Sequence, residues 1–153
     1  MFLKGSIKIN PTPKARPKLT RDGRAYNPRK TRDAQRQQAF LFSMLAKQAE
    51  AANPAVQFPV PTQLPLCVTV RFWHNGGKKG HPKRTIPDID NLLKLTLDAL
   101  TKARIWKDDN QITKLISEDL WAGDEPGKIE IEIEEHKIPG LLVQQELFTL
   151  SAK

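Results

Sequence analysis

Strict alternation between apolar and acidic side chains at residues 129–134, within a segment that spans residues 128–135, is the feature that most constrains the fold. Three isoleucines alternate with three glutamates between positions 129 and 134, so an extended chain presents one apolar face and one charged face. Residues 66–73 carry a similar signal, with Leu66, Val68, Val70 and Phe72 on one side. Such strands belong to a sheet that packs against the core on one face and is exposed to solvent on the other. The chain therefore needs helices to cover the apolar face.

Two segments have helical periodicity. The first runs from Thr31, which can cap it, to about Ala52, before Asn53-Pro54. Its buried stripe is predicted to contain Phe40, Leu41, Met44, Leu45 and Ala49. The second runs over residues 90–103, with an apolar stripe at Leu93, Leu97 and Leu100.

The remaining strands are expected at residues 2–9, 111–121 and 128–135, in addition to 66–73. The order β–α–β–α–β–β indicates the α/β class in its mixed α+β form, with a small mixed β-sheet and two main helices. A length of 153 residues suits one domain. We assign residues 1–138 to that domain and leave residues 139–153 as a C-terminal tail of unknown role. Trp106 and Phe72 are expected to be structural.

Several classes of protein are excluded by composition. No apolar run approaches the ~18 residues of a membrane-spanning helix, and residues 1–10 do not form the core of a signal peptide. The single cysteine, Cys67, rules out an intrachain disulfide framework and a multi-cysteine zinc site. On its strand Cys67 faces away from the apolar side, which favours an inert, half-buried thiol. A reducing cytoplasm is the expected compartment, with no membrane partner.

Charge is unevenly distributed along the chain. Residues 1–36 hold 11 lysines and arginines against two aspartates, and residues 71–87 hold five basic residues and no acid. Residues 108–153 hold 11 acids and four lysines. This pattern favours a polyanionic partner, with nucleic acid as the leading candidate, over a merely solvated loop. The expected phosphate contacts lie in a basic arm and a basic loop: Lys14, Arg16, Lys18, Arg21, Arg24, Lys78, Lys79, Lys83 and Arg84.

A group of aspartates forms the candidate catalytic site. Asp88 and Asp90 are two residues apart where an extended segment enters a helix, so their side chains can point the same way. Asp90 and Lys94 are four apart and share a helix face. Asp108-Asp109 follows the helix. Clustered carboxylates repel one another unless a cation lies among them, and hard oxygen ligands suit Mg²⁺.

The same residues also admit purely structural roles. Asp88 can cap the helix, Asp90 and Lys94 can form a solvated ion pair, and Asp108-Asp109 can form a turn. Spacing alone does not decide between these interpretations.

Two stretches resemble a known family. PDIDNLLKLTLDAL (residues 87–100) and IWKDDNQI (residues 105–112) resemble the RusA family of Holliday junction resolvases. PTPKARP (residues 11–17) and GRAY (residues 23–26) look like the basic arm of phage-type members. The resemblance covers roughly residues 5–135, and the tail after Pro139 departs from it.

The resemblance implies a RusA-like homodimer that cuts four-way DNA junctions with Mg²⁺ or Mn²⁺. Asp88, Asp90 and Asp109 match the family's three catalytic, metal-holding carboxylates. Lys94 matches its essential lysine and Asn91 its neighbouring asparagine, while Asp108 matches an adjacent acid. Some members have a basic residue directly before the first aspartate, where this chain has Pro87.

Three other hypotheses remain open. A PD-(D/E)xK nuclease site would use Pro87-Asp88 with Glu135 and Lys137. An HNH-type site would use His74, Asn75 and His81. A non-catalytic nucleic-acid-binding module would use the basic arm and leave the aspartates as cap and turn. The resolvase hypothesis requires that Asp88, Asp90 and Asp109 converge in a dimer.

Overall fold

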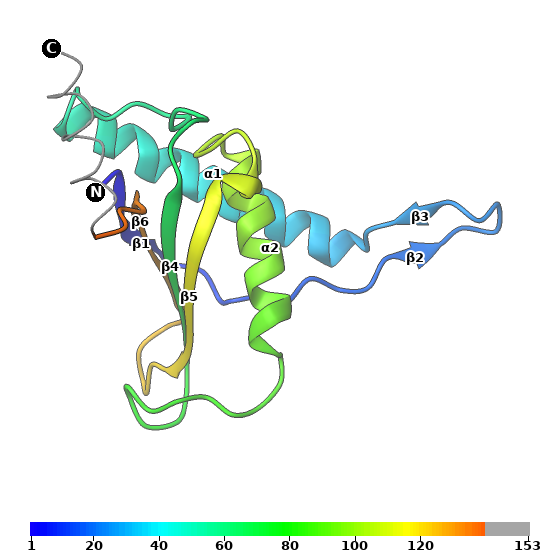
Figure 1. The fold of residues 1–153 in the computed structure, drawn as a ribbon. Helices are drawn as coiled ribbons and strands as arrows, with labels where there is room; N and C mark the ends of the chain where they lie inside the picture. The colour runs from blue at the N-terminus through cyan, green and yellow to red at the C-terminus, as the bar shows by residue number, and fades with distance from the viewer. Residues whose placement is uncertain (140–153) are drawn as a thin grey trace, which may run out of the picture.

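A computed structural model describes residues 1–139 as a four-stranded sheet with two helices and a projecting hairpin (Figure 1). The strands of the sheet are β1 (Leu3–Ile7), β4 (Leu66–His74), β5 (Ile112–Trp121) and β6 (Lys128–Glu135). Their spatial order is β1-β6-β4-β5. β6 is antiparallel to both neighbours and β4 is parallel to β5, so the sheet is mixed. The expected fold class is confirmed, and the expected tail lies outside the described residues.

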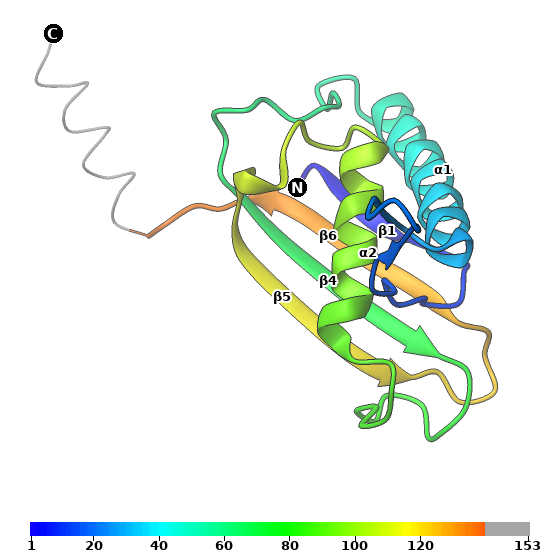
Figure 2. The ribbon, with the colours of Figure 1, turned by 90° about the vertical axis from the view of Figure 1, so that its right-hand side faces the viewer.

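Helix α2 (Ile89–Lys102) connects the two parallel strands and lies across the sheet, and α1 (Arg29–Ala52) lies beside α2 and β1 (Figure 2). The core forms between these helices and one face of the sheet. Val68, Val70 and Phe72 of β4 and the three isoleucines of β6 are buried there, as the alternation predicts. No helix among residues 1–139 is long and apolar enough to cross a membrane.

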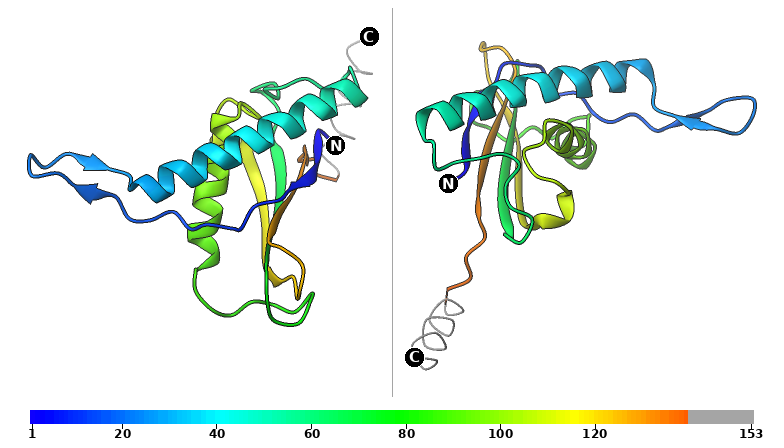
Figure 3. Two further views of the ribbon diagram at one scale, coloured as in Figure 1. Left: turned by 180° about the vertical axis from the view of Figure 1, so that it is seen from behind. Right: turned by 90° about the horizontal axis from the view of Figure 1, so that it is seen from above.

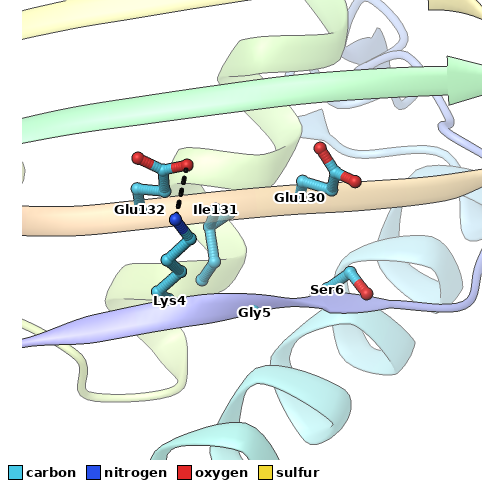
Figure 4. A pocket seen from close by; sticks show the side chains of 6 residues that line it. All are labelled: Lys4, Gly5, Ser6, Glu130, Ile131 and Glu132. Atoms are coloured by element: carbon cyan, nitrogen blue, oxygen red, sulfur yellow. Dashed lines mark ion pairs between the residues drawn. The ribbon is translucent and has the colours of Figure 1, made fainter.

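The other face of the sheet is open and charged. Arg71 on β4 donates to Glu118 on β5 at 2.6 Å and to Glu132 on β6 at 3.0 Å. These bonds raise the pKa of the arginine above its usual range. A shallow pocket lies on the same sheet across β1 and β6, where Lys4 is 3.7 Å from Glu132 (Figure 4).

The predicted stripe of α1 is right in part, because Leu41, Leu45 and Ala49 pack against the core. Phe40 and Met44 are exposed, however, and the buried positions are Ala39, Phe42 and Ala46. The helix also begins at Arg29 rather than at a Thr31 cap. The Thr31 hydroxyl instead accepts a hydrogen bond from the Ala15 backbone at 3.2 Å and so ties the basic arm to the helix.

On α2 the buried residues are Leu92, Leu95, Thr96, Ala99 and Leu100. Of the predicted stripe, Leu100 is fully buried, and Leu93 and Leu97 pack at the margin of the core.

The basic arm forms a hairpin, whereas the sequence pattern predicts only a loop with a turn. β2 (Lys18–Leu19) pairs antiparallel with β3 (Ala25–Tyr26), and Gly23 in the connecting turn has a φ of 77°. The hairpin projects well beyond the body of the molecule (Figures 1 and 3).

Candidate active site and nucleic-acid interface

The N-terminus of α2 carries the first pair of aspartates. Asp88 precedes the helix with an extended backbone, and its side chain makes no capping hydrogen bond. Its carbonyl oxygen accepts a hydrogen bond from the Leu92 amide, so the backbone of Asp88 takes part in the first turn of the helix. The carboxylate is exposed and makes no hydrogen bond to the helix. The alternative that Asp88 serves as a side-chain cap is therefore not supported.

Asp90 and Lys94 lie on one face of α2, as their spacing predicts. The Lys94 Nζ atom is 3.5 Å from Asp90 Oδ2, and both side chains are more than 60% exposed. An ion pair of this kind contributes only ~0.3–0.5 kcal/mol, so it leaves both groups available to a ligand. Asn91 is one turn from Lys94, and its carbonyl oxygen accepts from the Lys14 amide at 3.0 Å.

Asp88 borders a cleft formed with the second half of β5. The lining residues are 83–89 on one side and 117–119 on the other. Lys83 lines this cleft and holds one side of it by hydrogen bonds. Its Nζ donates to the carbonyl oxygens of Thr85 (2.6 Å) and Ile86 (3.0 Å). The segment that leads into Asp88 is therefore held by a buried ammonium.

Lys83, one of the predicted DNA contacts, is placed by the structure inside the molecule. Its side chain is only 4% exposed, and its Nζ lies 3.7 Å from the buried Asp119 carboxylate. The ammonium is turned inward and does not face a phosphate-binding surface. Sequence reasoning missed Asp119 because nothing in its neighbourhood distinguishes it from the other acids of β5.

The second pair of aspartates lies at the other end of α2. Asp109 begins the 3₁₀ turn η1 (Asp109–Gln111), and Asp108 caps it by accepting from the Asn110 amide at 3.1 Å. The turn is fixed by two buried side chains. Trp106 donates from Nε1 to Thr101 at 2.7 Å, and Gln111 donates to the Pro61 carbonyl oxygen at 3.0 Å. The structural role predicted for Trp106 is confirmed.

Asp109 lies near two other carboxylates, those of Asp108 and Asp98. A hydrogen bond with the Asp108 carboxyl raises the pKa of Asp109 above its usual range, and burial acts in the same direction. The negative charges of Asp108 and Asp98 raise this pKa further. Asp98 was not among the predicted site residues. It forms an ion pair with Lys14 at 2.7 Å, which occupies a lysine that was expected to contact phosphate.

One chain does not bring the three predicted catalytic aspartates together. Asp88 and Asp90 lie at the start of α2, and Asp109 follows its C-terminal end. Across the described residues 1–139, no group of three or more acidic, histidine or cysteine side chains is arranged to hold a metal ion.

The competing nuclease patterns do not converge either. Glu135 pairs with Leu66 at one end of β4, whereas the cleft beside Asp88 adjoins Asp119, which pairs with Phe72 near the other end. Six residues of strand, roughly 20 Å, separate them. His74 of the HNH-type pattern is a buried neighbour of Asp119, and Asn75 donates to loop carbonyl oxygens.

The hairpin arm carries the most accessible positive charge. Arg16, Lys18, Arg21 and Arg24 are exposed, and none of them has an acidic partner within 4 Å among residues 1–139. In the basic loop, Lys78 and Arg84 are exposed, whereas Lys79 pairs with Glu125 at 2.6 Å. The arm is therefore the main candidate for contact with a polyanion.

Comparison with known proteins gives two matches. Residues 8–134 match a family model described as endodeoxyribonuclease RusA. A curated protein of Lactococcus phage r1t, named crossover junction endodeoxyribonuclease rusA, is 39% identical over 75 residues. That match covers 47% of this chain and 56% of the relative, so the chain spans just over half the length of the curated relative that it matches.

Proposed function

The chain belongs to the RusA family of endodeoxyribonucleases, and we propose that it resolves Holliday (four-way) DNA junctions by paired, symmetrical nicks. Such an activity would serve DNA recombination and repair. The observation that carries the proposal is the Asp88–Asp90 pair. Both carboxylates are exposed: Asp88 lines a cleft, and Asp90 lies in the first turn of α2 with Lys94 on the same helix face. The exposed cationic arm supplies the means to hold DNA.

We propose Mg²⁺, or Mn²⁺ in its place, as the cofactor, with Asp88, Asp90 and Asp109 as ligands. Asp88 and Asp90 are two residues apart and both exposed, which fits a hard cation, because Mg²⁺ is often held by one or two carboxylates and completes its coordination with water and substrate phosphate. The proposed active species is a homodimer, because a twofold axis places two sites on opposed strands of a symmetrical junction.

The residues of the chain have separable roles in this proposal. Lys94 contacts the scissile phosphate or orients the attacking water, and Asn91 positions the same helix turn. The basic arm and Arg84 bind phosphates that flank the crossover. Cleavage expels the 3′-oxygen and leaves a 5′-phosphate, so the nicks can be ligated. Cys67 is buried and unpaired, consistent with a reducing cytoplasm as the proposed compartment.

The test is cleavage of a synthetic four-way junction in Mg²⁺, compared with a linear duplex of the same sequence. Wild-type protein is expected to nick the junction and to spare the duplex. Asp88→Asn is expected to bind the junction with wild-type affinity and to leave it uncut. Cleavage by Asp88→Asn at the wild-type rate contradicts the proposal.

A non-catalytic nucleic-acid-binding module is the second candidate, because the exposed side chains of the basic arm can bind nucleic acid whether or not the aspartates hold a metal ion. Junction binding by the wild-type protein without nicking, in Mg²⁺ and in Mn²⁺, supports this alternative.

A further inference from the structure

The projecting hairpin of β2 and β3 has two different faces. Lys18 is paired with Tyr26 and Leu19 with Ala25, and directly paired residues of an antiparallel ribbon lie on the same face. One face therefore carries a cation beside an aromatic ring, and the other carries two apolar side chains. Because side chains alternate along a strand, Arg24 lies on the same face as Tyr26. We refer to Lys18, Arg24 and Tyr26 as the cationic–aromatic face.

The cationic–aromatic face takes no part in the packing of the domain. Tyr26 is 45% exposed and does not belong to the hydrophobic core, and Lys18 and Arg24 are exposed as well. Among residues 1–139, neither cation has an acidic partner within 4 Å. The hairpin projects away from the body of the molecule (Figures 1 and 3), so all three side chains are available to a ligand.

Hydrogen bonds fix the tip of the hairpin. The Thr20 amide donates to the Arg24 carbonyl oxygen at 2.9 Å, and the Thr20 hydroxyl accepts from the Arg24 amide at 3.1 Å. The Gly23 amide donates to the Thr20 carbonyl oxygen at 3.0 Å. The backbone therefore sets the spacing between the two cations and the ring before any ligand binds, which lowers the entropic cost of binding.

The base of the hairpin is tied to α2 beside the proposed catalytic aspartates. The Lys14 amide donates to the Asn91 carbonyl oxygen at 3.0 Å, and the Lys14 Nζ atom is 2.7 Å from Asp98. Asn91 directly follows Asp90. The hairpin projects from the side of the molecule on which α2 lies (Figure 2). Lys18 is four residues beyond Lys14, at most ~13 Å, which is the rise of about four nucleotides of one strand. DNA bound at the start of α2 is thus within reach of the hairpin.

Cations beside an exposed aromatic ring form the pattern that binds unpaired nucleic acid. The cations hold phosphates, and the ring stacks on a base whose face is free. Inside a linear duplex both faces of each base are covered by its neighbours, so an aromatic ring gains little there. Unstacking costs least where pairing is already weakened or absent, as at the crossover of branched DNA.

We propose that the cationic–aromatic face binds unpaired nucleotides at the crossover of branched DNA, with Tyr26 stacked on one base and Lys18 and Arg24 bound to the phosphates beside it. The face thereby distinguishes a junction from a linear duplex. The four-way junction as substrate rests on the proposed function; the binding of unpaired DNA by this face does not.

The opposite face of the hairpin supplies a matched comparison. Leu19 is 71% exposed, more than Tyr26, and Ala25 is exposed beside it. An aliphatic side chain can wedge between bases, but this face has no cation to hold a phosphate next to it. Stacking by Tyr26 and wedging by Leu19 therefore predict different effects of substitution.

The first test observes Tyr26 directly. Tyr26 is the only tyrosine of the chain, so full-length protein labelled with fluorotyrosine gives one fluorine NMR signal. The probes are an oligothymidine of about 12 nucleotides, a linear duplex and a synthetic four-way junction, all without divalent metal so that no DNA is cut. The signal is expected to shift with the oligothymidine and the junction and to change little with the duplex. No shift with the oligothymidine, or an equal shift with the duplex, overturns the inference.

The second test measures affinity. Tyr26→Ala should weaken binding of the oligothymidine by at least ~5-fold, which corresponds to the lower limit for stacking on one base, and should leave duplex affinity unchanged. Tyr26→Phe keeps the ring and should bind like wild-type protein, as should Leu19→Ala on the opposite face. Equal losses of oligothymidine and duplex affinity in Tyr26→Ala overturn the stacking role. A loss in Leu19→Ala as large as that in Tyr26→Ala overturns the assignment of the face.

Neither test requires cleavage, so failure of the inference and failure of the proposed function can be distinguished. Wild-type protein that binds unpaired DNA through Tyr26 but never nicks a junction overturns the function and leaves the inference standing. Wild-type protein that nicks junctions while the fluorine signal of Tyr26 stays unchanged overturns the inference and leaves the function standing.

Discussion

Lys83 and Arg84 are neighbours in the basic loop with opposite roles. The Lys83 ammonium is buried against Asp119 and two carbonyl oxygens, whereas Arg84 is exposed. Lys83→Met should lower the free energy of unfolding by about 2–3 kcal/mol, because it leaves a buried carboxylate with one partner fewer. Arg84→Gln should change stability by less than ~0.5 kcal/mol and weaken junction binding. Urea unfolding and a binding titration measure both effects.

The assignment of Lys83 has a clear counter-result. If Lys83→Met unfolds like wild-type protein but loses junction affinity, the lysine contacts DNA and its buried position does not describe the working state.

His74 gives the domain a pH dependence. Burial is the main cause that lowers the pKa of His74, and the positive charge of Lys83 adds to it, although Asp119 opposes both. The folded-state pKa is then below the unfolded value of ~6.5. As the pH falls below that value, the unfolded chain binds a proton that the folded chain resists. The free energy of unfolding should therefore decrease from pH 7.5 towards pH 5.5.

Urea unfolding across this range measures the effect of His74. His74→Gln should flatten the dependence, whereas His136→Gln should preserve it. Equal slopes for wild-type protein and His74→Gln would show that another group is responsible.

The hairpin arm is the element with the clearest electrostatic role. Lys18, Arg21 and Arg24 are exposed and far from the core. Replacing all three by glutamine should reduce the slope of log affinity against log salt by up to ~2.7 per subunit, or ~5.4 for the proposed homodimer, since each lost phosphate contact accounts for ~0.9. Thermal stability should not change. Lys47→Gln, exposed on α1, is the control and should leave the slope within error.

For the arm, an unchanged salt slope in the triple variant would be the contradicting result. It would place the phosphate contacts on the body of the molecule, around Arg84 and Lys78.

At the scale of elements, sequence pattern located every main strand and helix but not every buried face. Period-two alternation in β4 and β6 is unambiguous because each strand has one fully covered side. α1 is harder, since apolar Phe40 and Met44 are exposed while Gln38 is buried and accepts from Thr96 of α2. A buried hydrogen bond between two helices depends on residues of both helices. The periodicity of one helix gives no information about the residue on the other.

For the site, the sequence identifies residue types and local spacing. Asp90 and Lys94 meet as predicted because helix geometry fixes their separation. The distance between Asp88 and Asp109 depends on the direction of α2 relative to β5, and the inward turn of Lys83 depends on Asp119, 36 residues later in the chain. Such long-range relations are set by the tertiary fold and leave no local pattern.

The whole molecule should show linkage between association and folding. The proposed function includes a homodimer, and dimerisation stabilises the folded state by mass action. The thermal midpoint should therefore rise by several degrees over a ~100-fold range of protein concentration. A midpoint independent of concentration in the wild-type protein would argue for a monomer.

The position of β6 has a consequence for synthesis of the chain. This last described strand lies between β1 and β4, and Leu3 is paired with Ile133. A nascent chain that has only just passed β5 already contains both helices and both halves of the proposed site, yet β1 has no partner strand and one edge of β4 is open. The sheet closes only after residue 135 has left the ribosome, and contacts of such long sequence separation form slowly. The domain should therefore acquire its fold, and with it the proposed ability to cut DNA, only after β6 has been synthesised.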